Sequence, residues 1–366
     1  MSAVYDNWER LVGATFKREE LRQIALCSSF SSCSVSSDFS FDSSFQDISA
    51  PSSMTNPTNR SARSMAFKEI KKATGNFQWD LRLGEGAFGI VYKGWIREDT
   101  LTAANGFMRA LSRSRIAVAV KKWKPFNDVS FLGPETWSTE LKYLCQLNHP
   151  NVVKLIGYCS EGGNFVLVYE LLPKGSLRNH LLRRGHQALS WDTRIEVAIG
   201  AARGLSFLHD REIPVIHRDF HADNILLDAD FNAKLSGFGL AKDGPTGDAS
   251  HVSTRVMGTW GFVAPEYVAT GHLTAKCDVF AFGVVLLQIL SGRANVDIQT
   301  SKLLMNGNKK LSQIVDPKLN GQYPRNAALA VMRLAFQCLN SDPKHRPRMD
   351  EVLVSLQKLQ APKNDG

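Results

Sequence analysis

The sequence has no apolar run long enough to cross a membrane, and no segment of it resembles a signal peptide. A membrane-spanning helix needs about 20 consecutive apolar residues, so no transmembrane segment is expected. The chain also lacks a run of basic residues of the kind that binds nucleic acid, although its formal net charge is +9. Because Lys and Arg are spread along the whole chain, nucleic acid is not expected as a partner.

Cysteine is scarce, and its spacing excludes two further classes of protein. The six cysteines form no Cys-x-x-Cys pair and follow no regular spacing: Cys27, Cys33, Cys145, Cys159, Cys277 and Cys338. Neither a disulfide framework nor a zinc site is therefore expected. Those in the folded part lie in apolar surroundings, which suits buried free thiols in a reducing, cytoplasmic compartment.

The N-terminal part differs in composition from the rest. Within residues 1–26, Trp8, Leu11 and Val12 recur at helical spacing and predict a short helix. Two interpretations stay open, a docking helix and a helix that frays in isolation. Residues 27–66 are dominated by Ser and are predicted to be a disordered linker.

Packed-domain character begins after this linker. We expect an N-terminal extension at 67–79, the main folded domain at 80–358 and a tail at 359–366. Strand patterns come first, at Leu81–Lys93, Ala117–Lys121 and Asn164–Tyr169. Helical patterns occur at Pro134–Leu147, Ser190–Asp210, Val279–Ser291, Asn326–Leu339 and Met349–Leu359. The order predicts an α+β fold of two lobes, a small β-rich N-lobe and a larger helical C-lobe.

A glycine-rich motif lies between the first two expected strands. It reads Gly84-Glu85-Gly86-Ala87-Phe88-Gly89-Ile90-Val91 and fits the pattern G-x-G-x-x-G-x-V. Glycines let a backbone approach phosphates closely. A dinucleotide fingerprint would need a helix directly afterwards, but the sequence continues as strand. We therefore expect nucleotide contacts from Leu83, Gly84, Glu85, Gly86, Ala87, Phe88, Gly89 and Val91.

A lysine on the following strand completes a phosphate-binding pattern. Lys121 ends the apolar run Val118-Ala119-Val120 and is expected to contact the nucleotide phosphates. Glu140, on the next helical pattern, is its expected ion-pair partner. Glu135 on the same helix is the alternative partner.

The strongest motif is His217-Arg218-Asp219-Phe220-His221-Ala222-Asp223-Asn224, which fits H-R-D-x-x-x-x-N. In this pattern the Asp accepts the proton of the attacking hydroxyl and the Asn holds a metal ion. Asp219 and Asn224 are therefore the candidate catalytic residues. Ala264-Pro265-Glu266 then closes an activation segment that begins near Ser236.

With four motifs in order, residues 67–358 resemble the receptor-like cytoplasmic kinases of plants. The stretches 148–159, 253–259 (which includes Thr259) and 264–283 are typical of that group. The resemblance implies a bilobal protein-kinase fold with ATP at a hinge formed by Glu170 to Leu172. It also implies a gatekeeper at Tyr169.

The resemblance further implies structural and regulatory roles for charged residues. Asp278 is expected to brace the catalytic loop, and Glu266 and Arg346 to form an ion pair in the large lobe. Arg218 is expected to pair with a phosphate on the activation segment, for which Ser253 and Thr254 are the best acceptor sites.

Three departures from the family separate this chain from a working kinase. Gly237 stands in Ser236-Gly237-Phe238-Gly239, where the family has an Asp that holds Mg²⁺. His221 stands where the family has a Lys that contacts the γ-phosphate. The segment between Arg293 and Leu311 is shorter than in relatives. Losing both charged groups would cost about 5 kcal/mol in the transition state, a slowing of some thousandfold or more.

Asp223 adds a carboxylate that could replace the missing Asp of position 237. It is adjacent to Asn224 in a loop, however, and adjacent loop side chains usually point apart. Asn224 alone then remains as a metal ligand. We expect ATP binding with weak or no Mg²⁺ dependence, since Mg²⁺ prefers oxygen ligands.

The leading hypothesis is a pseudokinase scaffold or decoy in plant signalling. Its expected partners are receptor kinases or other signalling proteins, and an active kinase that uses the chain as a substrate. The alternative is an active or weakly active Ser/Thr protein kinase. A cytoplasmic location is expected, or a peripheral one at the plasma membrane without myristoylation, because Met1-Ser2-Ala3 has no Gly at position 2.

Overall fold

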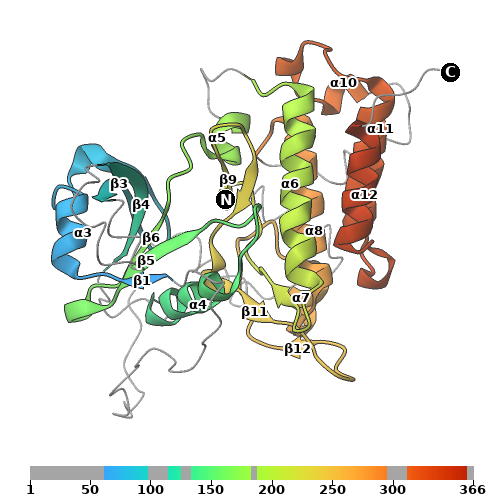
Figure 1. Ribbon diagram of the computed structural model, residues 1–366. Coiled ribbons are helices and arrows are strands. Elements are labelled where there is room, and N and C mark those ends of the chain that lie inside the picture. The colour runs from blue at the N-terminus through green and yellow to red at the C-terminus, as the bar shows by residue number, and fades with distance from the viewer. Residues whose placement is uncertain (1–61, 98–113, 125–132, 183–187, 295–310, 361–366) are drawn as a thin grey trace, which may run out of the picture.

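The computed structural model describes residues 62–97, 114–124, 133–182, 188–294 and 311–360. Figure 1 shows two lobes: one contains the sheet with α3 and α4, and the other is a bundle of longer helices. The fold class expected from the sequence is confirmed. The chain passes from the small lobe to the large lobe after the strand β6 (Val166–Glu170), through residues 171–174.

The small lobe is built on a six-stranded sheet with the order β1-β5-β6-β4-β3-β2. Its other strands are β1 (Arg63–Ser64), β2 (Arg82–Glu85), β3 (Gly89–Arg97), β4 (Arg115–Trp123) and β5 (Leu155–Cys159). The alternation in β3 buries Tyr92, Gly94 and Ile96 on one face. The helix α3 (Phe67–Ala73) covers this face and contributes Ile70 to the apolar cluster.

The prediction that the disordered linker extends to residue 66 is wrong at its C-terminal end. Residues 62–66 belong to the folded lobe, because β1 pairs in parallel with β5 and Met65 donates its backbone N–H to Tyr158 at 2.8 Å. Gly157 permits this approach: a Cβ there would lie 2.6 Å from the Met65 sulfur. The tail predicted from residue 359 begins later, since α12 continues through Gln360.

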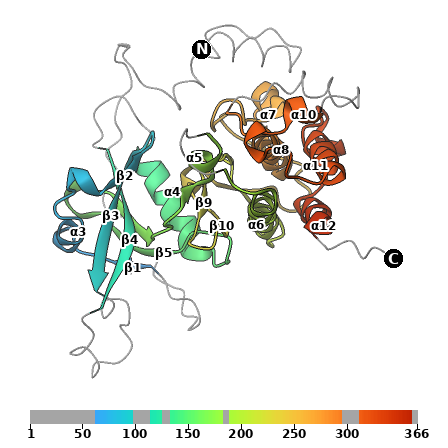
Figure 2. The same ribbon diagram turned by 90° about the horizontal axis from the view of Figure 1, so that it is seen from above.

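Within the described residues, the large lobe is built on long helices (Figure 2): α6 (Trp191–His209), α8 (Ala275–Ser291), α11 (Arg325–Cys338) and α12 (Met349–Gln360). Ser190 and Thr274 begin α6 and α8 by accepting backbone N–H groups of the first turn. The apolar sequence of α8 predicts burial on all sides, and Cys277 through Ser291 are all buried.

The helix α4 (Gly133–Gln146) belongs to the small lobe and lies between the sheet and the large lobe (Figure 1). Short elements connect the long ones: η1 (Trp79–Leu81), η3 (Glu161–Gly163), β7 (Gly175–Ser176), α5 (Leu177–Leu182), β8 (Val215–Ile216), β9 (Ile225–Leu227), β10 (Ala233–Leu235), η4 (Phe238–Leu240), β11 (Lys242–Asp243), β12 (Val252–Ser253), α7 (Pro265–Thr270), β13 (His272–Leu273), α10 (Leu311–Ile314), η5 (Pro317–Leu319) and η6 (Pro343–His345).

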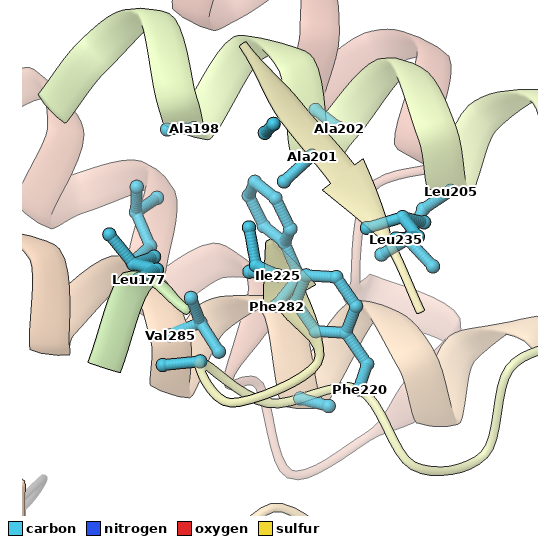
Figure 3. Close-up of a cluster of buried hydrophobic side chains, with 14 of the residues drawn as sticks. Leu177, Ala198, Ala201, Ala202, Leu205, Phe220, Ile225, Leu235, Phe282 and Val285 are labelled. Atoms are coloured by element: carbon cyan, nitrogen blue, oxygen red, sulfur yellow. The ribbon is translucent and has the colours of Figure 1, made fainter. Parts of the chain in front are cut away.

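The core of the large lobe anchors the loop between β8 and β9. Phe220, which lies inside this loop, is 1% exposed, and its ring packs on Phe282 of α8 with the ring centroids 5.8 Å apart. Figure 3 shows both rings beneath α6, close to Ile225 and Leu235. The loop is therefore fixed by apolar packing of Phe220 on α8.

Several sequence-based expectations concern other parts of the chain. The helix expected within 1–26, the linker up to residue 61 and most of the shortened segment, at 295–310, lie outside the described residues. Among the helices of the described part, none is long and apolar enough to span a membrane. The four cysteines in that part are free thiols, buried at 159, 277 and 338 and half-buried at 145.

A buried ion pair joins α7 to the end of the large lobe. Arg346 donates from Nη1 and Nη2 to the two oxygens of Glu266, each at 2.7 Å. Its side chain has no exposed surface, and its Nε donates to the Asn340 carbonyl at 2.8 Å. Every guanidinium nitrogen therefore has an acceptor, as a buried charge requires.

Replacing Arg346 by Ala should lower the free energy of unfolding by about 3 kcal/mol, because it leaves the Glu266 carboxylate unpaired. Thermal or urea unfolding measures the change. Arg348→Ala is the matched control, since the Arg348 side chain is 64% exposed and exposed pairs contribute roughly 0–1 kcal/mol. Equal effects of the two changes would contradict the structural role of the Glu266–Arg346 pair.

Candidate functional site

The glycine-rich loop joins β2 to β3 as a tight turn. Gly86 donates its N–H to the Gly89 carbonyl at 2.9 Å. Only glycine fits at 89, because a Cβ there would lie 2.5 Å from the Lys122 carbonyl oxygen. Cβ atoms at Gly84 and Gly86 would meet nothing within 4 Å. The turn therefore leaves open space beside Gly84 and Gly86 for an approaching phosphate.

The other predicted residues of this loop surround the glycines. Leu83 and Ala87 are exposed and Phe88 is partly buried. Val91 lies opposite Lys121 in the β3–β4 ladder. The Glu85 carboxylate is paired with Arg82 and with Lys124, the latter at 2.6 Å. Of these side chains, Val91 thus lies directly beside the expected phosphate-binding lysine.

Lys121 is held by Glu140 on α4. Its Nζ lies 2.7 Å from Glu140 Oε2 and 4.3 Å from the centre of the Trp123 ring. The second carboxylate oxygen of Glu140 accepts the Tyr169 hydroxyl at 2.8 Å. Glu140 is 2% exposed, whereas Glu135 is exposed to solvent. The structure thus places Glu140, and not the alternative Glu135, beside the lysine.

Tyr169 is fully enclosed at the end of β6. Burial, reinforced by the Glu140 carboxylate, raises the pKa of its hydroxyl well above the ordinary value. The phenol therefore stays protonated and donates to Glu140. The predicted gatekeeper thus also fixes the carboxylate that pairs with Lys121.

The hinge offers backbone rather than side-chain groups. The Glu170 carboxylate accepts the Lys154 backbone N–H at 2.8 Å and Lys234 Nζ at 2.9 Å. The Leu172 carbonyl accepts the Gly175 N–H at 3.1 Å. Within the described part of the chain, the N–H of Leu172 has no acceptor. A ligand with a ring nitrogen would supply one.

The catalytic-loop motif is positioned by Asp278. This carboxylate accepts the backbone N–H groups of His217 at 2.7 Å and Arg218 at 2.8 Å. It is 1% exposed. Arg218 adopts a φ of 68°, in the left-handed region that non-glycine residues rarely enter. Two hydrogen bonds to one buried carboxylate stabilise that conformation and aim the following residue, Asp219, away from the core.

Both oxygens of the Asp219 carboxylate have partners. Oδ1 accepts from the Thr259 backbone N–H at 2.9 Å and from its hydroxyl at 2.6 Å. Oδ2 accepts from Asn224 Nδ2 at 3.3 Å. Burial alone would raise the pKa of Asp219, but His221 and Thr259 lower it to about 2. The predicted base is therefore ionised, and Thr259 occupies the side of it that faces the activation segment.

His221 lies between two carboxylates. Its Nε2 is 3.6 Å from Asp219 Oδ2, and its Nδ1 is 3.5 Å from Asp223 Oδ2. Burial lowers the pKa of His221, but the two carboxylates outweigh it and raise the pKa to about 9. Nε2 also lies 3.0 Å from Asn224 Nδ2. With the imidazole protonated, His221 Nε2 and Asn224 Nδ2 are both donors. Asp219 Oδ2 is the acceptor that they share.

This arrangement revises the sequence-based interpretation of two residues. His221 was treated as a lost positive charge, but its imidazolium restores a cation at that position. Asp223 does not lie free to replace the missing carboxylate, because it faces His221 and also Arg178, 3.7 Å away. The new acid and the new histidine are thus partners of each other.

Gly237 has a φ of 78° and caps η4. A Cβ at this position would lie 2.5 Å from Asn224 Oδ1, so the Asn224 side chain occupies the space where any side chain at 237 would begin. Asn224 is held there by a hydrogen bond from its Nδ2 to the Asp219 carbonyl at 2.8 Å.

The side chains present do not fit a magnesium ion. Mg²⁺ needs several oxygen ligands in octahedral geometry. Gly237 supplies none, so the Asn224 Oδ1 atom, which faces Gly237, is the one oxygen that remains of the expected pair of ligands. Across the described residues, no three His, Cys, Asp or Glu side chains gather where they could hold a metal ion.

The activation segment meets the catalytic loop at Arg218. The guanidinium donates to the Tyr267 hydroxyl at 2.7 and 2.9 Å and to Thr254 Oγ1 at 3.2 Å. Ser253 lies in β12 with an exposed side chain. Of the two predicted phosphate acceptors, Thr254 is therefore the one already in contact with Arg218.

Sequence reasoning missed the partners that orient several of these groups. Tyr267, which receives two hydrogen bonds from Arg218, directly follows the Ala-Pro-Glu motif and carried no separate signal. Lys234, which holds the Glu170 carboxylate, is distant in sequence and adjacent only in the fold. The contact between Asn224 and His221 likewise depends on the turn between them.

Comparison with known proteins gives a consistent result. A family model described as "Protein tyrosine and serine/threonine kinase" matches residues 77–356. The chain is similar to "Probable serine/threonine-protein kinase PBL2" of Arabidopsis thaliana, with 54% identity over 83% of this chain and 72% of the relative. It is 48% identical to "Receptor-like cytoplasmic kinase 176" of Oryza sativa subsp. japonica, over 83% of this chain and 78% of that protein.

The charge state of His221 predicts a pH dependence of stability. The pKa of His221 is about 9 in the folded state, raised from 6.5. The contacts of the protonated imidazole therefore contribute their full stability below pH 6.5, and this contribution is lost as the pH rises through 9. When the pH is lowered from 10 to 6, the free energy of unfolding of the parent should therefore rise by up to about 3 kcal/mol relative to that of His221→Gln. Urea unfolding at both values measures this gain. An imidazole NMR titration near 6.5 would contradict the assignment.

Proposed function

The chain belongs to the receptor-like cytoplasmic kinase family of plants, and we propose that within this family it acts as a pseudokinase that binds ATP and serves as a signalling scaffold or decoy. The observation that carries the proposal is the geometry at Gly237. The ligand that should hold Mg²⁺ is absent, and the Asn224 side chain lies where a side chain at position 237 would begin.

Nucleotide binding is supported by the parts of the site that remain complete. The open turn at Gly84 and Gly86 suits phosphates, and the Leu172 N–H suits a purine ring nitrogen. Lys121 is oriented by Glu140 in a way that requires no metal ion. ATP held in this way would rely on Lys121 and the glycine-rich loop for the phosphate charge.

Weak or absent phosphotransfer is supported by the site's lack of a metal-binding set. Phosphoryl transfer depends almost entirely on positioning and on charge stabilisation by metal ions and cationic side chains. The imidazolium of His221 supplies one positive charge, but it is bound to Asp219 and Asp223. The same contacts hold Asp219 away from the role of a free proton acceptor.

A signalling role is supported by the surface around Arg218. A phosphate on Thr254 would replace the hydroxyl that Arg218 already contacts at 3.2 Å with a doubly charged group. The chain can thus be a substrate of an active kinase even if it transfers no phosphate itself. Receptor kinases are the expected partners, at a cytoplasmic site or at the plasma membrane surface.

A weakly active Ser/Thr kinase is the second candidate. It is favoured by the imidazolium at His221, which replaces the missing lysine charge, and by the intact Lys121–Glu140 pair. The relatives named above are described as kinases or probable kinases. Phosphotransfer by the unmodified protein that Asp219→Asn abolishes would establish this candidate and overturn the first.

Nucleotide affinity should depend strongly on Lys121 and little on Mg²⁺. Lys121→Ala should abolish ATP binding measured by titration calorimetry, because it removes the cation nearest the phosphates. Lys122→Ala is the matched control: its Nζ lies over the Phe77 ring on the other face of β4, and its loss should leave affinity unchanged. Tightening of ATP binding by Mg²⁺ of tenfold or more would contradict the proposal.

Restoring the missing groups should restore chemistry. Gly237→Asp should give measurable phosphotransfer, since Asp is among the residues that best tolerate a positive φ. Asn224 must rotate away, because its Oδ1 lies 2.5 Å from the new Cβ. Adding His221→Lys should increase the rate further, and the two effects should be non-additive because both act on one transition state.

A radiolabel transfer assay measures the repaired activity, with Asp219→Asn in the double variant as the control. Inactivity of the folded double variant would show that the defect is not confined to Gly237 and His221.

A further inference from the structure

The residues that follow Gly237 run along α4. Phe238 is completely buried, and its ring lies 4.9 Å from that of His217. Gly239 lies against the helix: a Cβ there would be 3.2 Å from the Thr136 carbonyl oxygen and 3.5 Å from Glu140 Oε2. The first turns of α4 therefore rest on η4, directly beside the carboxylate that pairs with Lys121.

Asp243 holds the other end of the same helix. Its Oδ2 accepts Lys142 Nζ and its Oδ1 accepts the Tyr143 hydroxyl, each at 2.9 Å. Figure 1 shows β11, which contains Asp243, beside α4. Both carboxylate oxygens are thus used by two consecutive residues of one helix, about 100 positions earlier in the chain.

The hydrogen bonds that Asp243 accepts from Lys142 and Tyr143 contribute differently to stability. Lys142 and Asp243 side chains are 49% and 48% exposed, and an ion pair so open to water contributes little. Tyr143 is 3% exposed, so removing its acceptor would leave a buried hydroxyl unpaired. The hydrogen bond from Tyr143 therefore provides most of the connection.

The backbone of Asp243 is fixed independently of α4. It pairs with Val215 of β8, the strand that leads directly into the catalytic loop. Glu140 precedes Tyr143 by three positions and so lies on the same side of the helix. Holding Tyr143 to Asp243 therefore fixes the distance between α4 and the catalytic loop, and with it the position of the Glu140 carboxylate.

We propose that Asp243 is a positioning residue that locks α4 to the segment after Gly237 and so keeps Glu140 paired with Lys121 in a site that lacks the metal-binding Asp. The inference rests on the proposed nucleotide binding for its consequence, though not for its geometry. Asp243 thereby determines what fraction of molecules has Lys121 ready to receive phosphate.

The test uses the full chain with Asp243→Ala, Tyr143→Phe and Asp243→Asn. If α4 is held inward in only a tenth of Asp243→Ala molecules, ATP affinity falls about tenfold, since apparent affinity scales with the competent fraction. Tyr143→Phe should approach the same loss. Asp243→Asn keeps an acceptor for Tyr143 and should stay near the parent. Asp248→Ala, an exposed change in the same segment, should have no effect.

Hydrogen exchange provides a readout that needs no nucleotide. Amides of α4 should exchange faster in Asp243→Ala while those of α8 do not change, which a general loss of stability would not produce. The double variant Asp243→Ala/Tyr143→Phe should be no worse than either single change. Unchanged α4 exchange in folded Asp243→Ala would overturn the proposal. A parent that binds no ATP would overturn the proposed function alone, since the exchange comparison would still test the Asp243–Tyr143 contact.

Discussion

The arrangement of the site depends on one buried carboxylate, that of Asp278. It accepts two consecutive backbone N–H groups, from His217 and Arg218, and His209 Nε2 lies 2.9 Å from it. Its place in the first turn of α8 is favourable for a negative charge. Because Arg218 is held in a left-handed conformation, the chain reverses there. Asp219 consequently points toward Thr259, and Arg218 points toward the activation segment.

This network contains no group that requires a metal ion. Phe220 anchors the catalytic loop on Phe282, and Glu266 with Arg346 joins the parts of the large lobe. Lys121 and Glu140 are oriented by contacts within the protein. The interactions that give the molecule its shape therefore form without a metal ion. Glycine at position 237 supplies no side-chain oxygen, and these contacts do not depend on one.

The two lobes, the order of the main strands and helices, and the Lys121–Glu140 contact were predictable from the sequence, because each rests on a local pattern or a spaced motif. The position of β1 was not, since Arg63 and Ser64 pair with β5 only because Gly157 leaves room for Met65. The charge on His221 was not predictable either. It arises from two carboxylates whose distances are set by the turn between 219 and 224.

The backbone at position 237 explains why the substitution is compatible with the fold. A φ of 78° is strained for most side chains and unstrained for glycine. Glycine therefore keeps the conformation that directs Phe238 into the core and Gly239 against α4. The Asn224 side chain lies beside Gly237 and is hydrogen-bonded to the Asp219 carbonyl. Glycine at position 237 therefore supplies no carboxylate, while the packing of Phe238 in the core and of Gly239 against α4 is kept.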